Sequence, residues 1–224
     1  NTSAYSQVTS AMLIKLLDST RKERNDSIRL MLNSSFKKDL TNFMSKPAFM
    51  PDSVRNLRIG QTSSSDGNLI FYNWNIQQND GKNHYSAIIY FPVTRKVISL
   101  PVKTSESKLS ADSIFQSNDW PGALYYKIIS PKSKTDNYYI MLGWDRFSRQ
   151  TSRKTIEALT ILNDSVIVFG KEVFKNKEGR TKRIIIEYAS SANLALNYSK
   201  QKLTLTGVRK SQSKVNDSII VVDR

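Results

Sequence analysis

The sequence predicts a mainly β fold: an antiparallel meander, sandwich or open barrel of about ten strands, preceded by a helical segment. Apolar residues recur every third or fourth position up to about residue 46, and from residue 56 onward they alternate with polar ones. No helical pattern separates the later strands, which excludes parallel βαβ units. We therefore expect a helical segment over 1–50, packed on the sheet or on a partner, and an antiparallel β domain over 51–224.

The N-terminal segment is expected to form two amphipathic helices. Val8, Met12 and Leu16 share one stripe of the first helix. The second helix should begin near Asn25, because Asn25-Asp26-Ser27 has good N-cap chemistry, and Pro47 should end it.

The strands are expected from alternation and from turn residues between the runs. An Asp-Gly turn at 79–82 should join strands at 69–76 and 84–91. The run 97–103 contains Pro101, which cannot donate to a neighbouring strand, so this run should lie at a sheet edge. A short helix is expected over 110–116. Further strands are expected at 123–130, 138–144, 155–162, 166–169, 183–188, 194–198, 202–208 and 218–222.

The chain is strongly basic, with 34 Lys+Arg against 19 Asp+Glu and a formal charge of +15. Such a charge is typical of proteins with polyanionic partners. The basic residues, however, are spread over every region, with an excess in the last third, and lack interleaved aromatics or a known nucleic-acid-binding motif. Dispersed surface charge is thus favoured over a dedicated anion site, and nucleic-acid binding rests on charge alone.

Several kinds of chemistry are excluded by composition. The chain has no cysteine and one histidine, His84, so it offers no disulfide, no thiol nucleophile and no histidine-rich metal site. It lacks the common hydrolase, phosphate-binding and dinucleotide-binding motifs. We assign no catalytic residue, metal ligand or cofactor, and favour a binding protein over an enzyme. No apolar run is long enough for a transmembrane helix, although a lipid anchor on a removed N-terminus stays open.

Two sets of side chains remain as site candidates. Four carboxylates lie in apolar surroundings and would serve a glycosidase if two of them shared a cleft; otherwise they are turn-forming or outward-facing groups: Asp119, Asp145, Glu157 and Glu187. Trp120 and Trp144 lie at strand–turn boundaries, where they would stack on a ligand or else pack in the core. We take Trp120, Trp144, Asp145 and Arg146 as binding candidates.

A triplet of Asp, Ser and an aliphatic residue recurs more often than composition predicts. It places serine at Ser27, Ser53, Ser113, Ser165 and Ser218. One interpretation is cap and turn chemistry ahead of an apolar helix or strand. The other is modification, because the triplet resembles the O-glycosylation acceptor of exported Bacteroidetes proteins.

A longer resemblance covers about two thirds of the chain. The stretch WPGALYYKII from Trp120, the stretch YYIMLGWD from Tyr138 and the stretch RIIIEY from Arg183 resemble, in the same order, stretches of an uncharacterised family of secreted Bacteroidetes proteins. Arg146 departs from the family, which usually has Gly there. The resemblance implies an exported periplasmic or surface protein with its signal sequence removed, and it implies no catalytic residues.

Three functions are compatible with the sequence. The favoured one is a non-enzymatic, exported envelope protein, a binding or assembly component whose basic surface faces a partner protein or an anionic glycan. The alternatives are a carbohydrate-active hydrolase with two carboxylates on a β scaffold and, last, nucleic-acid binding by charge.

Overall fold

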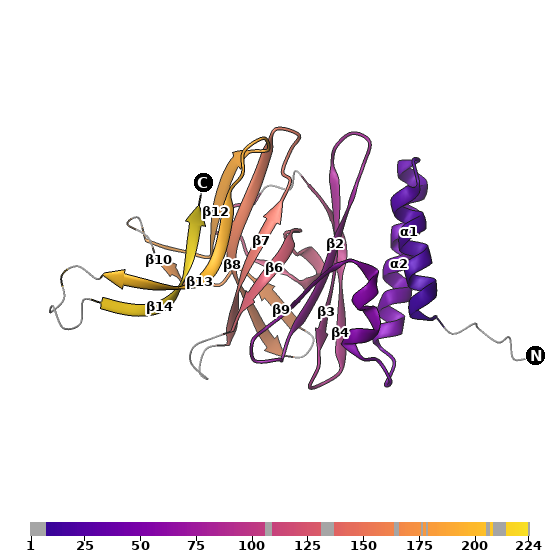
Figure 1. Ribbon diagram of the computed structural model, residues 1–224, viewed down its shortest axis with the longest axis horizontal. Helices are drawn as coiled ribbons and strands as arrows, with labels where there is room; N and C mark the ends of the chain where they lie inside the picture. The colour runs from indigo at the N-terminus through magenta and orange to yellow at the C-terminus, as the bar shows by residue number, and fades with distance from the viewer. Residues whose placement is uncertain are drawn as a thin grey trace, which may run out of the picture.

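The computed structural model describes residues 8–105, 109–130, 137–163, 166–175, 177, 179–204, 207 and 214–223. As predicted, the chain is mainly β, with antiparallel sheets and two helices at the N-terminal end. Figure 1 shows its layers side by side: the helices, a first sheet, a second sheet and a C-terminal hairpin. Of the predicted architectures, the two stacked sheets correspond to a sandwich.

The helices begin where capping chemistry predicts. α1 (Ser10–Lys22) is capped by Thr9, and α2 (Asp26–Met44) by Asn25, whose side chain accepts hydrogen bonds from the backbone N–H groups of Ser27 and Ile28 at 3.0 and 3.2 Å. These bonds satisfy donors that the first turn leaves unpaired. A 3₁₀ helix, η1 (Pro51–Leu57), then leads into the first sheet.

The first sheet is four-stranded, in the order β1-β2-β3-β4. Its strands are β1 (Gly60–Ser63), β2 (Ile70–Gln77), β3 (Asn83–Phe91) and β4 (Lys96–Thr104). The expected Asp-Gly turn joins β2 to β3, and Gly81 adopts a φ of 88°, which suits a residue without Cβ. β4 is an edge strand, which confirms the position predicted from Pro101.

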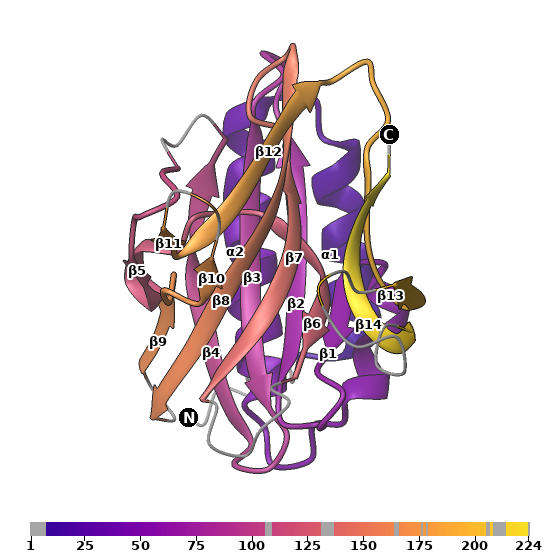
Figure 2. The same cartoon turned by 90° about the vertical axis from the view of Figure 1, so that its left-hand side faces the viewer.

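The second sheet is built around the long strand β8. It contains β5 (Phe115–Gln116), β6 (Leu124–Ile129), β7 (Tyr138–Asp145), β8 (Thr151–Asn163), β9 (Val166–Phe169) and β12 (Arg183–Ala189). The order is β5-β9-β8-β7-β6, and β12 also pairs with β8. A 3₁₀ turn, η2 (Ser117–Asp119), follows β5. Figure 2 looks toward this sheet, with the helices at the back.

The remaining strands form two hairpins. β10 (Phe174–Lys175) pairs with β11 (Arg180–Thr181), and β13 (Ala195–Thr204) pairs with β14 (Lys214–Asp223) along its whole length. Two predictions are corrected here. The run 110–116 holds a turn and β5 instead of a helix, and the segments 194–198 and 202–208 are not separate strands, because β13 is continuous through Thr204. Residues 205, 206 and 208 lie outside the described part.

Three apolar clusters hold the layers together. The largest lies between the sheets and includes Phe71 and Ala87 from the first, and Tyr125 and Met141 from the second. The opposite face of the first sheet packs on the helices, where Phe36 meets Trp74 edge-on at 5.2 Å. Strands β2 and β3 are thus buried on both faces. A third cluster seats the C-terminal hairpin on the second sheet.

Candidate binding groove

The structure places Trp120 in the core. Its side chain is fully buried, packs near Phe71 and Tyr125, and its indole N–H donates to the Pro101 carbonyl. A buried indole is closed to a ligand, so the binding role predicted for Trp120 is replaced by the alternative, core packing.

Trp144 and Asp145 lie on opposite faces of β7, and Arg146 follows the end of this strand, where its backbone N–H donates to the Tyr85 hydroxyl at 2.8 Å. Successive residues of a strand point to opposite faces. Trp144 is half-buried, and its indole N–H donates to the Tyr188 hydroxyl at 3.0 Å. Asp145 is buried. Nε of Arg153 donates to both of its carboxylate oxygens, each at 3.1 Å. Burial raises the pKa of Asp145 to about 6, although the Arg153 guanidinium opposes this shift.

The four candidate carboxylates differ in burial: two are buried and two are exposed. Glu157 is buried, accepts a hydrogen bond of 3.2 Å from Arg183 and another from the Tyr125 hydroxyl, and has its pKa raised by burial. Asp145 and Glu157 therefore each form a buried ion pair with an arginine. Asp119 and Glu187 are exposed, and Asp119 pairs with Lys103. None of the four lines the groove described next, whereas a two-carboxylate hydrolase needs two carboxylates in one cleft.

A groove runs along the free side of β2 and is here called the β2-edge groove. It consists of two adjoining cavities of about 510 and 360 Å³ that share Arg21 and Asn75 in their walls. Other polar side chains of the walls come from α2, from the chain entering β1, and from β1, β2, β6 and the β2–β3 turn: Arg29, Arg58, Gln61, Thr62, Asn73, Gln77, Gln78, Asn79 and Tyr126. Among the described residues that line the two cavities, none carries a carboxylate.

The free edge exists because β1 is short. β1 pairs only with the first half of β2, from Gly60 opposite Asn73 to Ser63 opposite Ile70. Just before β1, Arg58 adopts a left-handed conformation with φ 54° and ψ 37°, which costs a residue with a Cβ about 1–2 kcal/mol. The turn at Arg58 ends η1 and takes the chain away from β2, and none of the strands that the structure describes pairs with the second half of β2 on this side.

The direction of the backbone groups follows from alternation. Gln78 donates its backbone N–H to the Lys82 carbonyl at 2.8 Å, so the backbone groups of Gln78 point toward β3. In an antiparallel strand, the N–H and C=O groups of one residue point to the same side, and those of the next residue point to the other side. Because Gln78 points toward β3, the backbone groups of Asn75 and Gln77 point away from β3 and into the β2-edge groove. The Gln77 carbonyl accordingly accepts a hydrogen bond of 2.6 Å from Arg29.

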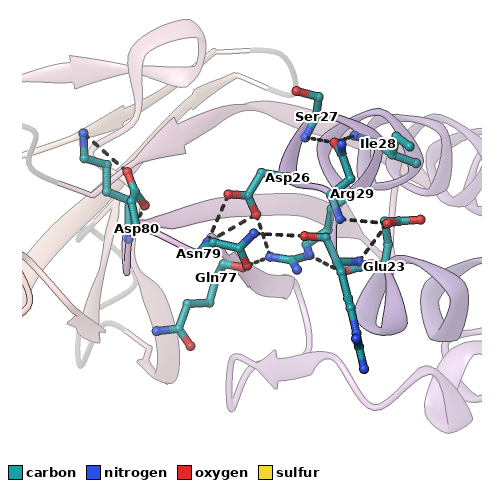
Figure 3. A network of polar contacts seen from close by, with 11 residues as sticks. Glu23, Asp26, Ser27, Ile28, Arg29, Gln77, Asn79 and Asp80 are labelled. Carbon is teal, nitrogen blue, oxygen red and sulfur yellow. Dashed lines mark hydrogen bonds and ion pairs between the residues drawn. The ribbon is translucent and has the colours of Figure 1, made fainter.

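One wall of the groove is fixed by a polar network between the α1–α2 turn and the β2–β3 turn (Figure 3). Arg29 also donates to the Glu23 carbonyl and to Asp26, each at 2.8 Å. Asp26 accepts from the backbone N–H of Asn79 at 3.1 and 3.2 Å, and the Asn79 side chain donates to the Arg24 carbonyl at 2.9 Å. The helices are thereby held against the end of β2.

The opposite wall joins the two sheets. A register shift after Tyr125 interrupts the β6–β7 ladder, and the Tyr125 carbonyl instead accepts from Thr62 at 3.1 Å and from the Asn73 side chain at 3.0 Å. Tyr126 is held by its hydroxyl, which donates to the Leu196 carbonyl at 3.0 Å, and by Lys154 over its ring at 4.5 Å.

The groove is electropositive. Arg21 and Arg58 are exposed, and Arg21 donates to the Arg58 carbonyl at 2.9 Å. Within the described ranges, neither guanidinium forms an ion pair. Sequence reasoning missed this site because its residues come from five elements that are brought together only by the fold, and only the overall positive charge pointed to it.

The serine candidates differ in accessibility. Ser27 and Ser53 are exposed, near the beginnings of α2 and η1, while Ser113 and Ser218 are half-buried. Ser165 lies outside the described residues. The caps and turns predicted for these triplets are seen at Ser27, which follows the Asn25 cap, and at Ser53, whose hydroxyl donates to the Met50 carbonyl at 2.6 Å.

Comparisons with known proteins add no identification: no family model, no curated protein and no solved structure matches the chain. Among the helices that the structure describes, none has the length and apolar character needed to cross a membrane.

Proposed function

We propose that this protein is a non-enzymatic binding or assembly component of the cell envelope, and that its β2-edge groove takes an acidic segment of a partner protein. The observation that carries the proposal is the groove itself, in which Arg21 and Arg58 are exposed and no carboxylate is found among the lining residues that the structure describes. Guanidinium groups are suited to carboxylates because they donate in a planar fork. The envelope location rests on the family resemblance of the sequence.

The other candidate functions find less support in the structure. The buried carboxylates Asp145 and Glu157 are each neutralised by an arginine inside the sandwich. Such pairs perturb pKa values for structural reasons as readily as for catalytic ones. Nucleic-acid binding still depends on net charge alone, because the described residues of the groove include no exposed row of aromatic side chains for base stacking.

The test is a binding measurement by fluorescence anisotropy. The probe is a short fluorescein-labelled peptide of alternating Glu and Thr. We expect the double variant Arg21→Glu/Arg58→Glu to weaken binding by about tenfold or more, which corresponds to about 1.4 kcal/mol. The control is Lys200→Glu/Lys202→Glu on β13, which reverses as many exposed charges outside the groove and should change affinity little.

Three outcomes would contradict the proposal. Equal weakening by both double variants would indicate diffuse electrostatic attraction without a site. Binding of polygalacturonate without binding of the peptide would make an acidic glycan the partner. Absence of binding to both probes at low salt would remove the acidic-partner proposal altogether.

A further inference from the structure

We propose that the β2-edge groove receives its acidic partner as an added β-strand, paired with the free edge of β2 at Asn75–Gln77. This inference rests on the proposed function and specifies the mode of recognition. Strand addition supplies main-chain hydrogen bonds for affinity, and side-chain contacts along the groove supply the preference for an acidic chain.

The backbone of β2 provides the pairing groups. Asn75 directs its N–H and C=O into the groove, and Gln77 directs its N–H there, while Arg29 already occupies the Gln77 carbonyl. Within the described part of the chain, no backbone hydrogen bond outside the strand ladders is formed by Asn75, and β1 stops pairing at Asn73. Three main-chain groups are therefore available to a short extended segment lying in line with β1.

The surroundings of this edge favour a strand over other shapes. Asn75 lines both cavities, so the free backbone lies at their junction, with Arg21 and Arg58 along the same groove. A strand repeats its side-chain direction every second residue, at about 6.6 Å. An extended chain with acidic residues at alternate positions would thus direct one set of carboxylates toward the guanidinium groups. An acidic glycan would meet the same charges but has no regular series of N–H and C=O groups.

A second copy of this chain is a poor occupant of the edge. Edge pairing between two copies would bring the Arg21 and Arg58 groups of both into one region, and each copy carries a net charge of +15. Like charges placed together oppose edge-to-edge association, as lysines do on many natural edge strands.

The first experiment removes N–H donors from the peptide probe. The Glu-Thr peptide is made in two further versions, N-methylated either at all Glu or at all Thr residues. A strand bonds its neighbour only through alternate residues, so we expect one version to lose about tenfold or more in affinity and the other to bind within about threefold of the parent.

The second experiment removes a donor from the protein. Asn75→Pro deletes the N–H that points into the groove, at an edge position where proline is tolerated, and should weaken binding by about tenfold. Asn75→Ala removes the side-chain bond to Asn83 but keeps the backbone N–H, so it measures the contribution of the side chain alone. A loss of affinity in Asn75→Ala as large as that in Asn75→Pro would contradict the role given to the backbone N–H. Ser99→Pro on the edge strand β4 controls for a proline placed in the same sheet.

The outcomes separate the mode of binding from the proposed function. If both N-methylated peptides bind like the parent, or both lose affinity equally, strand addition is overturned, while dependence on Arg21 and Arg58 would keep the groove as the site. If the parent peptide does not bind, both proposals fail. If Asn75→Pro does not fold, as judged by circular dichroism, the pair of methylated peptides decides the question on the natural chain.

Discussion

The guanidinium of Arg29 donates a 2.6 Å hydrogen bond to the backbone carbonyl of Gln77, 48 residues away in the sequence. This contact joins the first turn of α2 to the last residue of β2. It is reinforced by Asp26, which pairs with Arg29 and also accepts from the backbone of Asn79. One arginine therefore fixes both the position of the helices on the sheet and one wall of the β2-edge groove.

Replacing Arg29 should destabilise the fold. We expect Arg29→Ala to lower the free energy of unfolding by about 2 kcal/mol, because charge-assisted hydrogen bonds of a mostly buried side chain are lost. Arg55→Ala is a matched control, since the Arg55–Asp52 pair is largely exposed and should contribute less than about 1 kcal/mol. Urea unfolding of both variants measures the difference, and equal effects would contradict the role given to Arg29.

The buried pair Glu157–Arg183 should be more sensitive still. Both side chains are almost fully buried, so Glu157→Gln leaves the Arg183 charge without its counter-ion and should cost about 3–5 kcal/mol. The double variant Glu157→Leu/Arg183→Met should recover much of that loss, because it removes both charges. Thermal unfolding followed by circular dichroism provides the readout, and a double variant no more stable than Glu157→Gln would argue against the ion pair as the cause.

Stability should depend on pH through Asp145. Burial raises its pKa from 3.8 to about 6 in the folded state, so between about pH 4 and 6 the folded protein binds more protons than the unfolded chain. The contribution of Asp145 is therefore full below pH 4 and is lost as pH rises through 6, by an amount on the order of 3 kcal/mol.

This dependence can be measured in two ways. Carbon-detected NMR should give a titration midpoint for the Asp145 carboxyl near pH 6. The difference in unfolding free energy between the natural chain and Asp145→Asn should also decline over the same pH interval. A midpoint below pH 4 would mean that Arg153 outweighs burial, and the slope between pH 4 and 6 would then vanish.

The C-terminal hairpin should be held mainly by Leu196. This side chain is buried against Leu142 and Ile156 of the second sheet. Leu196→Ala should cost about 2–4 kcal/mol and should raise hydrogen-exchange rates in β13 and β14. Leu162→Ala is the control, because Leu162 is 61% exposed. Unchanged exchange in the hairpin of Leu196→Ala would show that other contacts hold it.

Local signals predicted much of the fold. Asn25 caps α2, the Asp-Gly turn joins β2 to β3, and Pro101 lies on an edge strand, because each of these residues acts through its own backbone or its nearest neighbours. The helix predicted over 110–116 was wrong, because the helical periodicity of this run is weak and its structure depends on distant partners. The carbonyls of Ser110 and Ser113 accept hydrogen bonds from Arg183.

The site could not be predicted in the same way. A tryptophan at a strand–turn boundary has the same sequence signature whether it faces solvent or the core. Trp120 is buried because the second sheet packs over the first, which its neighbours in the sequence do not show. Asp145 and Glu157 meet their arginines across strand pairs, which no sequence spacing reveals. The β2-edge groove depends on where β1 stops pairing, and that is set by the left-handed turn at Arg58.

Amide NMR of the full chain during titration with the Glu-Thr peptide shows most directly where the acidic segment binds. Binding in the β2-edge groove predicts the largest shifts at the backbone amides of Asn75, Gln77 and Gln61. Shifts concentrated at Lys200 and Lys202 of the hairpin, or in the β7–β8 turn, would contradict it and place the acidic ligand elsewhere.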